Sequence, residues 1–298
     1  MNCQLCPRQC GVDRAAGQVG YCRMGATIMA ARAALHFWEE PCISGIGGSG
    51  TVFFSGCNLR CIYCQNHEIS TAGKGYPVTP QRLREIFYEL IEQGAENINL
   101  VTPTHFVPQI AEALREKLPV PVIYNCGGYE SVETLRLLDG LVDIYLPDMK
   151  YSDASLAARL SAAPDYPEVA ERAIAEMFRQ TGGQVYDGRG RLLSGVQVRH
   201  MVLPGFLENT YGVLDWFSSR YRKAGVGFSL MSQFTPTPAC QSEPTLRRRL
   251  NPEEYERAVD YMYLCGITTG FVQELSSANE EYIPAFNGMG ILPIRRIK

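Results

Sequence analysis

The sequence lacks any apolar run long enough to span a membrane, for which roughly twenty apolar residues are needed. The only apolar stretch near its start, residues 26–35, is short and is interrupted by Arg32. Four cysteines precede this stretch, an arrangement that does not fit a secretory signal. We therefore expect a cytoplasmic protein with no membrane partner.

The chain also lacks an excess of charge of either sign. Its 28 Lys and Arg residues against 31 Asp and Glu residues give a formal net charge of −3 at pH 7. Proteins that bind nucleic acid usually carry a basic surface. The one dense basic run, residues 247–249, is typical of a solvated loop or helix face. We expect no nucleic-acid partner.

Cysteine, by contrast, is abundant, with 11 residues in the chain. In a reducing compartment, clustered cysteines are typical of metal ligands or catalytic thiols rather than of disulfides. Residues 1–25 hold four of them and contain too few large apolar residues to fold by burial alone. Four thiolates that bind a metal would supply folding free energy. We predict such a metal site at Cys3, Cys6, Cys10 and Cys22.

The identity of this N-terminal metal stays open between zinc and an iron–sulfur cluster. Both suit soft thiolate ligands, and the Cys-x2-Cys-x3-Cys part of the segment also matches iron–sulfur spacing. A mobile tail with free cysteines is the simpler alternative.

A second group of cysteines, Cys57, Cys61 and Cys64, follows the apolar run at residues 52–54. This run predicts a buried strand, so the three thiols are expected on a loop at its carboxyl end. The glycines of residues 44–50 spell Gly-x-Gly-x-x-Gly, but they lead into the strand instead of following one. They predict a flexible approach to the loop and no dinucleotide site.

Three kinds of metal site are compatible with these thiols. Zinc could be bound with His67 as the fourth ligand, although zinc sites usually join two separated ligand pairs. A four-cysteine electron carrier would need Cys42 or Cys126, in a chain much too large for a simple carrier. The third is a 4Fe-4S cluster with three thiolates and one iron open to substrate or cofactor.

A length of 298 residues suits one large domain or two modest ones. After the cysteine loop, strand-like patterns alternate with helical ones, which predicts a parallel sheet. Helices are expected at residues 79–93, 106–117, 131–138, 166–180, 207–223 and 252–265. Strands are expected at residues 97–101, 120–124, 142–146, 197–203 and 227–231 and near residue 271, with a hairpin at residues 187–188. About six βα units are fewer than the eight of a closed barrel. We expect a cysteine-rich extension at residues 1–50 and a partial (β/α)6 barrel with a C-terminal βα unit at residues 51–298.

Polar residues follow several of the expected strands. Ligands of such sheets bind beyond the carboxyl ends of the strands, the end at which the cysteine loop is also expected. The candidates at this rim are Thr102, Thr104, His105, Asn125, Cys126, Asp148, Lys150, Ser232 and Gln233.

The Cys57-x3-Cys61-x2-Cys64 motif, with Tyr63 before its last cysteine, resembles that of the radical S-adenosylmethionine superfamily. The resemblance implies a 4Fe-4S cluster whose open iron is chelated by S-adenosylmethionine. It also implies that the reduced cluster cleaves this cofactor to a 5'-deoxyadenosyl radical for hydrogen abstraction. An oxidoreductase of this kind takes its electron from a donor such as flavodoxin or ferredoxin.

Further segments are similar to the pyruvate formate-lyase activating enzyme family of glycyl-radical-enzyme activases, in its uncharacterised branch with an N-terminal cysteine cluster. They are residues 57–66, Asn125 with its glycines, residues 148–150 and residues 198–205. The resemblance implies that Lys150 holds the cofactor carboxylate, that Asp148 contributes to a monovalent-cation site and that Arg199 contacts the cofactor. The family's Gly-Gly-Glu has no match here, which makes Thr102 and Thr104 candidates for that contact. The full set of expected cofactor-binding residues is Tyr63, Asn66, Thr102, Thr104, Asn125, Asp148, Lys150 and Arg199.

Three functions follow as hypotheses. The first is an activase that abstracts a glycine hydrogen from a glycyl radical enzyme. The second directs the same radical chemistry at a small molecule or a non-glycyl peptide residue. The third is a zinc-stapled binding module without catalysis. For the second function, the candidate pocket residues are His105, Cys126, Tyr129, His200 and Gln233.

Overall fold

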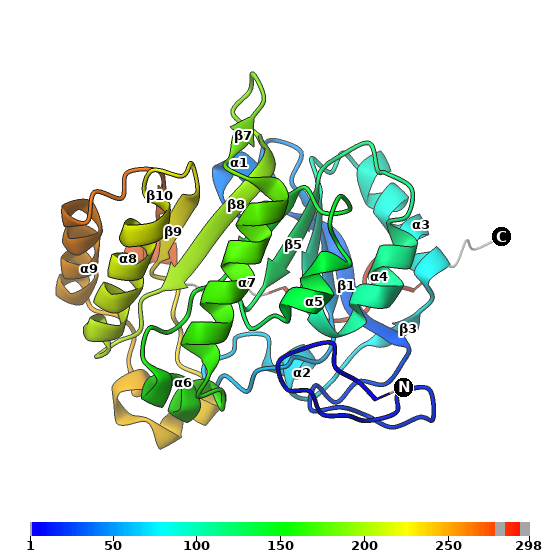
Figure 1. Ribbon diagram of the computed structural model, residues 1–298, viewed down its shortest axis with the longest axis horizontal. Helices are drawn as coiled ribbons and strands as arrows, with labels where there is room; N and C mark the ends of the chain where they lie inside the picture. Colours follow the sequence, from blue (N-terminus) through cyan, green and yellow to red (C-terminus); the bar gives the residue numbers. More distant parts are fainter. Residues whose placement is uncertain (1, 278–283, 293–298) are drawn as a thin grey trace.

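The computed structural model describes residues 2–277 and 284–292 as an α/β fold built on one sheet (Figure 1). The strands are β1 (Ile28–His36), β2 (Ser49–Phe54), β3 (Tyr76–Val78), β4 (Ile98–Val101), β5 (Val122–Cys126), β6 (Ile144–Pro147), β7 (Val185–Tyr186), β8 (Leu192–Met201), β9 (Gly227–Met231) and β10 (Gly270–Val272). The helices are α1 (Pro41–Ser44), α2 (His67–Ser70), α3 (Pro80–Glu92), α4 (Val107–Ala113), α5 (Val132–Arg136), α6 (Ala154–Ser161), α7 (Tyr166–Thr181), α8 (Leu207–Tyr221) and α9 (Pro252–Leu264). None of the helices in this part of the chain has the length and apolarity of a membrane span.

The sheet runs in the order β10-β9-β8-β6-β5-β4-β2-β1-β3, with β7 paired to β8 as a hairpin. The path from β10 to β2 is parallel, whereas β1 is antiparallel to both β2 and β3. The expected α/β class and partial barrel are confirmed. Because the parallel strands share one direction, their carboxyl ends lie along a single edge of the sheet.

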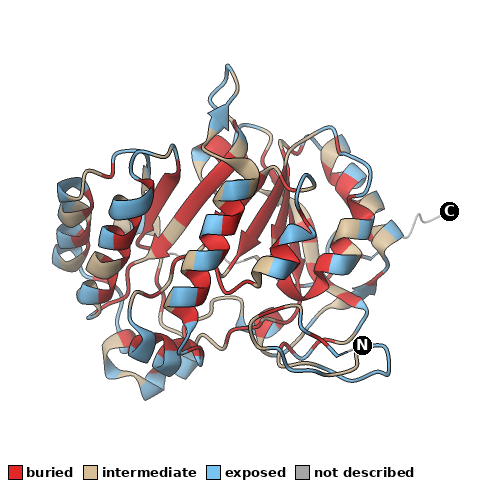
Figure 2. Ribbon diagram, in the orientation of Figure 1, coloured by how far each residue is buried: buried red, intermediate tan, exposed pale blue. Residues whose placement is uncertain are grey.

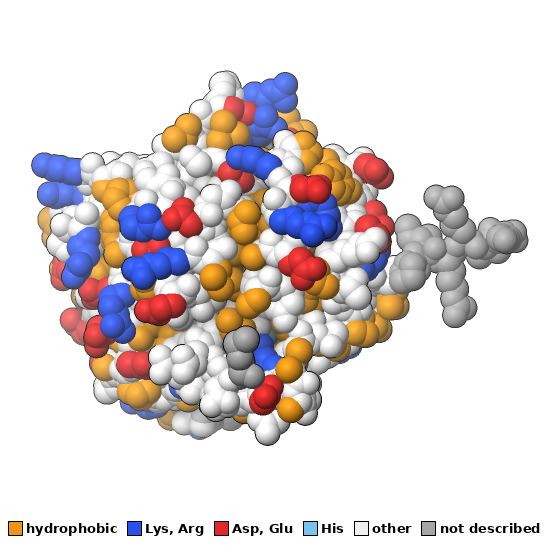
Figure 3. All heavy atoms as spheres, turned by 45° about the vertical axis from the view of Figure 1, so that its right-hand side comes forward, with side chains coloured by type: hydrophobic (Ala, Val, Ile, Leu, Met, Phe, Trp, Pro, Cys, Tyr) orange, Lys and Arg blue, Asp and Glu red, His pale blue; other side chains and the backbone are white. Residues whose placement is uncertain are grey.

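The larger helices lie in front of the sheet in Figure 1, and Figure 2 shows that their buried faces turn toward it. α3 shows how the sequence determines where such a helix begins. Thr79 caps its first turn by accepting a hydrogen bond from the Arg82 backbone N–H, and Pro80 occupies the first helical position. Arg84 of α3 pairs with the exposed Glu116, which follows α4, and Figure 3 shows basic and acidic side chains interspersed on one face.

Several predicted elements differ from the structure in their bounds. α4 ends at Ala113, four residues before the expected end, and the strand expected at residues 120–124 is β5, shifted toward the C-terminus. Asn125 and Cys126 therefore belong to the strand itself and not to the turn after it. α6, which the sequence analysis did not predict, begins after Asp153, whose carboxylate accepts two backbone hydrogen bonds as the N-cap.

The sheet begins earlier than expected. The apolar stretch at residues 26–35 largely forms β1, whose register with β2 places His36 opposite Ser49 and Ala30 opposite Phe54. The expected division at residue 50 thus falls inside β2. The glycines before β2 permit close packing, since a Cβ at Gly47 would lie 2.3 Å from the carbonyl oxygen of Gly94. They lead into the strand, as predicted.

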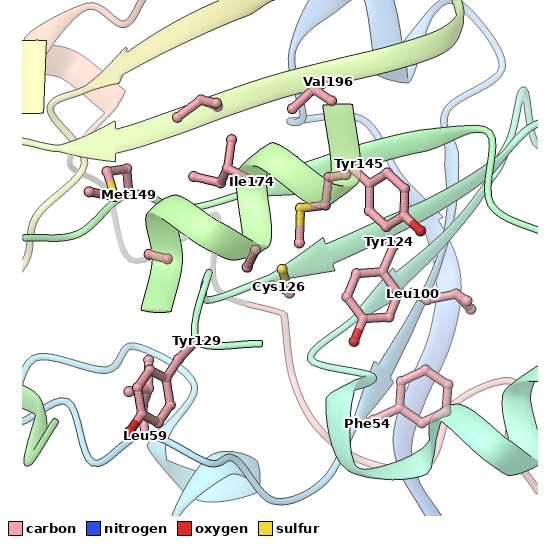
Figure 4. Close-up of a cluster of buried hydrophobic side chains, with 14 of the residues drawn as sticks. Phe54, Leu59, Leu100, Tyr124, Cys126, Tyr129, Tyr145, Met149, Ile174 and Val196 are labelled. Carbon is pink, nitrogen blue, oxygen red and sulfur yellow. The ribbon is translucent and has the colours of Figure 1, made fainter. Parts of the chain in front are cut away.

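The core lies between the sheet and the helices. Figure 4 shows Tyr124 of β5 and Tyr145 of β6 side by side, with Ile174 of α7 and Val196 of β8 nearby. Cys126 is buried in the same cluster. Its thiol also donates a hydrogen bond to the buried carboxylate of Glu130.

Candidate active site

The three cysteines of the central motif lie on the loop at residues 55–66, between β2 and α2. Two of them, Cys61 and Cys64, line a cavity of about 180 Å³ at the carboxyl end of the sheet. The loop is held by backbone hydrogen bonds to α6, from the Arg60 N–H to Ser161 and from the Ile62 N–H to Leu160. The predicted position of the cysteine loop, at the end of a buried strand, is confirmed.

Each of the three sulfur atoms has a hydrogen-bonding neighbour. The Leu59 backbone N–H donates to Cys57 at 3.4 Å, the Ser161 hydroxyl donates to Cys61 at 2.9 Å, and the Ser70 hydroxyl lies 3.3 Å from Cys64. Hydrogen bonds of this kind stabilise thiolates and adjust the potential of iron–sulfur clusters.

Without a metal, burial favours the neutral thiols. It raises the pKa of Cys57 to about 12, and it raises the pKa of Cys61 although the Lys150 ammonium opposes the shift. Metal binding replaces these protons with a cation, since thiolates are the ligating form. The site is therefore suited to a group that carries positive charge.

A series of hydrogen-bonded hydroxyl groups ends at the sulfur of Cys61. The hydroxyls of Tyr63 and Tyr151 are 2.6 Å apart, and Tyr151 is 2.6 Å from Ser161, which in turn donates to Cys61. Tyr63, one of the expected cofactor contacts, lines the cavity. Tyr151 and Ser161 were not predicted as part of the site, because no helix was expected at residues 154–161.

The three thiolates suit a 4Fe-4S cluster, in which protein thiolates bind separate irons. The described ranges, 2–277 and 284–292, contain no group of three or more His, Cys, Asp or Glu side chains that could hold one metal ion. In a 4Fe-4S cluster each thiolate binds a different iron, so the sulfur atoms lie farther apart than around zinc. Cys57, Cys61 and Cys64 would hold such a cluster, with the cavity beside it.

Asp148 and Lys150 follow β6 and face the same cavity. The Lys150 ammonium donates to Asp148 at 2.6 Å. Burial favours a raised pKa at Asp148, but Lys150 and Arg199 outweigh it and lower that pKa. Conversely, the Asp148 carboxylate raises the pKa of Lys150 against the effect of burial. Both side chains are charged at neutral pH.

Arg199, on β8, uses all three guanidinium nitrogens within the protein. Its Nε donates to Asp148 at 3.0 Å, Nη1 to Glu39 at 3.2 Å and Nη2 to Asn125 at 2.6 Å. Arg199 lines the cavity. In this arrangement its guanidinium holds Asp148 and Asn125 and has no pair of nitrogens left to bind a cofactor carboxylate. Asn125 is not among the residues that line this cavity.

Two acidic residues of this network, Glu39 and Glu40, were not predicted from the sequence. They precede α1, at the opposite edge of the sheet. Glu39 accepts a hydrogen bond from Asn99 at 2.9 Å and Glu40 from Ser229 at 2.7 Å. Burial raises the pKa of Glu40 despite the opposing charge of Arg199. The sequence signal that could have indicated these two residues is a pair of adjacent carboxylates between an apolar stretch and Pro41.

Thr102 and Thr104 lie outside the cavity lining. The Thr104 hydroxyl donates to the buried carboxylate of Glu130 at 2.7 Å, and burial raises the pKa of Glu130 to about 7. Thr102 has a φ of 59°, a left-handed conformation that is strained for a β-branched residue. The remaining expected contact, Asn66, lines the cavity.

Of the residues considered for a substrate pocket, Gln233 lines the cavity. His105 and His200 are buried and bonded to backbone carbonyls, and burial lowers the pKa of each to about 4. The Tyr129 hydroxyl donates to Asp165 at 2.7 Å. These three side chains are committed to the protein interior.

A larger cavity, of about 430 Å³, opens on the other side of Gln65, which lines both cavities. The Gln65 amide donates to the carbonyl of Gln233 at 3.0 Å. Thr235 lines the larger cavity with a buried hydroxyl that has no partner in the described part of the chain. The cavity therefore offers an unused hydrogen-bonding group next to the cysteine loop.

The radical SAM family model matches residues 51–206, just over half of the chain. The chain belongs to the radical SAM superfamily. It is therefore an enzyme, and the family's cofactors are a 4Fe-4S cluster and S-adenosylmethionine. The alternative of a non-catalytic zinc-stapled module is wrong.

A relative in Methanocaldococcus jannaschii, the uncharacterized protein MJ0674, is 29% identical over 273 residues, which are 87% of this chain and 73% of the relative. Among solved structures, Streptococcus suis SuiB bound to S-adenosylmethionine gives a TM-score of 0.49 at 12% identity, over 76% of this chain and 50% of SuiB. A spore photoproduct lyase mutant gives 0.49 at 14% identity, over 74% of each chain. The present chain thus spans about half the length of SuiB.

Proposed function

We propose that this radical SAM enzyme abstracts a hydrogen atom from an extended peptide segment of a partner protein, as a glycyl-radical-enzyme activase does. A 4Fe-4S cluster held by Cys57, Cys61 and Cys64, together with S-adenosylmethionine, would supply on one-electron reduction the carbon radical that takes the substrate hydrogen. The electron comes from a flavodoxin- or ferredoxin-type donor. The observation that carries the peptide proposal is the larger cavity beside the cysteine loop.

The cofactor occupies the smaller cavity in this proposal. The Lys150 ammonium faces that cavity and is held by Asp148 at 2.6 Å, so it meets the cofactor carboxylate in a fixed position. Arg199 holds Asp148 from the other side and acts as a positioning residue. A monovalent cation at Asp148 stays a prediction, since both carboxylate oxygens already accept hydrogen bonds from cationic side chains.

The larger cavity suits a peptide because of its lining. Two proline-containing segments, residues 235–238 and 284–287, form part of its walls. The exposed side chains of His67 and Glu68 form another part. The unpartnered Thr235 hydroxyl can bond a peptide group of the substrate.

The charged groups around the smaller cavity also suit hydrogen-atom abstraction. Asp148, Lys150 and Arg199 are paired with one another, so none of these three is a free acid or base. Abstraction by a carbon radical needs proximity and alignment rather than proton transfer. The arrangement is consistent with either a peptide or a small-molecule substrate, and the larger cavity favours the peptide.

The test is anaerobic incubation of the protein with S-adenosylmethionine, a reductant and candidate glycyl radical enzymes. We expect a glycine-centred radical in the partner by electron paramagnetic resonance, and deuterium transfer into 5'-deoxyadenosine when the partner carries deuterated glycine. A variant with Cys57, Cys61 and Cys64 changed to Ala is the control and should give neither signal. Deoxyadenosine release without a protein radical across such partners would favour the small-molecule function.

A further inference from the structure

The N-terminal segment, residues 2–25, folds as two turns that bring four thiols together. The first turn is closed by backbone hydrogen bonds from Cys3 to Val12 and from Gly11 to Cys3, and the second by one from Arg23 to Gly20. The side chains then meet across the turns. The Cys3 thiol donates to Cys10, and a Cβ at Gly20 would lie 3.1 Å from the sulfur of Cys10 and 3.6 Å from that of Cys22.

Backbone N–H groups are aimed at three of these sulfur atoms. The donor lies two residues after the cysteine in each case, at Arg8 for Cys6, Val12 for Cys10 and Met24 for Cys22. The same spacing occurs in the cluster loop, where Leu59 donates to Cys57. Such donors stabilise the thiolate, the form that binds metals.

All 11 cysteines are free thiols, and those at positions 3, 6 and 22 are buried. Only two residues of the segment, Cys22 and Met24, join the main hydrophobic core. Burial of apolar surface therefore accounts for little of the fold of these turns. A metal that joined the four sulfur atoms would hold them instead.

The segment is also fastened to the cysteine loop of the active site. The Arg60 guanidinium donates to the Tyr21 carbonyl and lies over the Tyr21 ring at 4.4 Å. Arg8 covers the same ring at 4.2 Å and donates to the Asn58 carbonyl at 2.8 Å. Tyr21 precedes Cys22, and Arg60 precedes Cys61, so each contact joins residues next to thiols of the two groups.

Gly56 makes this attachment closer still. It has a φ of 84°, and a Cβ there would lie 2.5 Å from the Met24 side chain and 2.6 Å from the Cys22 carbonyl. The residue before Cys57 is therefore in direct contact with the turn that carries Cys22. Figure 1 shows the N-terminal segment beside α2, at the same edge of the molecule.

We propose that Cys3, Cys6, Cys10 and Cys22 form a tetrathiolate site for zinc or iron, and that this site braces the active-site cysteine loop through Tyr21 and Arg60. As arranged in the described residues, neither the four thiols nor Cys57, Cys61 and Cys64 form a single-ion site. Metal binding draws the four sulfur atoms together. The bracing role rests on the proposed function, whereas the metal site does not.

The metal site is tested in the variant with Cys57, Cys61 and Cys64 changed to Ala, which removes the active-site cluster. We expect either one zinc per chain or iron with matching sulfide, and these two results distinguish zinc from an iron–sulfur cluster. Adding Cys6→Ser or Cys22→Ser should abolish the bound metal. Adding Cys265→Ser, which changes a thiol far from this segment in the sequence, should leave the bound metal unchanged.

If the Cys6→Ser variant does not fold, cobalt gives a second test. Metal stripped from the triple variant by a chelator is replaced with Co²⁺, which should produce thiolate charge-transfer absorption at one equivalent. A triple variant that holds no metal and shows no such absorption would overturn the site. So would a thiol titration under denaturing conditions that finds two thiols fewer than the sequence allows.

The brace is tested by Arg60→Lys and Tyr21→Leu in the otherwise unchanged chain. Both should keep the N-terminal metal but lose at least half of the active-site iron and of the spectral change on adding S-adenosylmethionine. The matched controls are Arg84→Lys and Tyr88→Leu, because Arg84 lies over Tyr88 at 5.3 Å on α3. Equal iron content in all four variants would overturn the bracing role and leave the metal site standing.

Discussion

The Arg199 guanidinium donates its Nε–H to Asp148 at 3.0 Å, and the other oxygen of the same carboxylate accepts from Lys150 at 2.6 Å. Asp148 is thus fixed from two sides. Arg199 is in turn held by Glu39 at 3.2 Å, which comes from the opposite edge of the sheet. The position of the Lys150 ammonium therefore depends on residues from three separate parts of the chain.

Replacing Arg199 should destabilise the fold strongly. Arg199→Leu leaves the largely buried Glu39 carboxylate without its cation and leaves Asp148 with Lys150 alone; removing one partner of a buried ion pair typically costs about 3–5 kcal/mol. Urea denaturation at pH 7 would measure the loss. Arg220→Leu is the control, because Arg220 pairs with Glu171 at the surface and such pairs contribute about 0–1 kcal/mol. Equal losses in both variants would contradict the buried network.

Lys150→Met should weaken binding of S-adenosylmethionine, and Asp148 keeps Arg199 as its cationic partner in this variant. A hydrogen bond to a charged group contributes about 1.5–3 kcal/mol, which corresponds to an affinity loss of about 10- to 100-fold. Equilibrium dialysis with the anaerobic, cluster-loaded protein measures it. Lys74→Met is the control, because Lys74 is exposed and lines the larger of the two described cavities but not the smaller one. This variant should bind the cofactor normally. Unchanged affinity in Lys150→Met would exclude this role.

Gly56→Ala should damage the cysteine loop for two separate reasons. The left-handed backbone costs about 1–2 kcal/mol with a side chain, and overpacking against Met24 and Cys22 adds about 1–3 kcal/mol. Gly190→Ala isolates the first effect, because Gly190 has a φ of 77° with nothing within 4 Å of the added Cβ. Thermal unfolding and iron content should both fall further in Gly56→Ala. Matching results would show that the contact with the N-terminal turn is not tight.

Glu130 predicts a pH-dependent contribution to stability. Burial raises its pKa from 4.5 to about 7, so the folded chain keeps a proton that the unfolded chain releases. The resulting stability is complete below about pH 4.5 and is lost as the pH rises through about 7, with a total of about 3 kcal/mol at 1.36 kcal/mol per pKa unit.

Glu130→Gln should therefore flatten the dependence of unfolding free energy on pH between 5 and 8, and should be the more stable protein at pH 8. Denaturant titrations at several pH values give the comparison. Glu92→Gln, which changes an exposed residue at the end of α3, should keep the slope of the unchanged chain. A parallel profile for Glu130→Gln would mean that the carboxyl does not hold its proton.

Much of the fold could be predicted because hydrophobic periodicity and caps act locally. α3 has Thr79 and Pro80 at its start, and its predicted bounds agree with the structure within one residue. α6 was missed because its eight residues carry few large apolar side chains. β1 was missed because pairing with β2, a contact between distant parts of the chain, decides that its apolar stretch is a strand.

The site could be predicted only where its residues share a motif or follow a strand. Cys57, Cys61 and Cys64 meet both conditions, and Asp148 with Lys150 meets the second. Glu39 reaches Arg199 across 160 positions of sequence, so no local pattern could reveal the pair. Thr102 and Thr104 follow a strand as expected, but the Thr104 side chain is bound to Glu130.

The antiparallel strand β1 also determines how far the chain can be shortened. Composition places a boundary at residue 50, yet β1 covers one edge of β2 from Ala30 to His36. Removing residues 1–50 would uncover the backbone donors and acceptors of β2 next to buried Val52 and Phe54. An unpaired apolar edge of this kind is a template for pairing with other chains. A fragment that begins at residue 51 should therefore aggregate when it is expressed, whereas one that begins just before Ile28 should keep the sheet closed on that side.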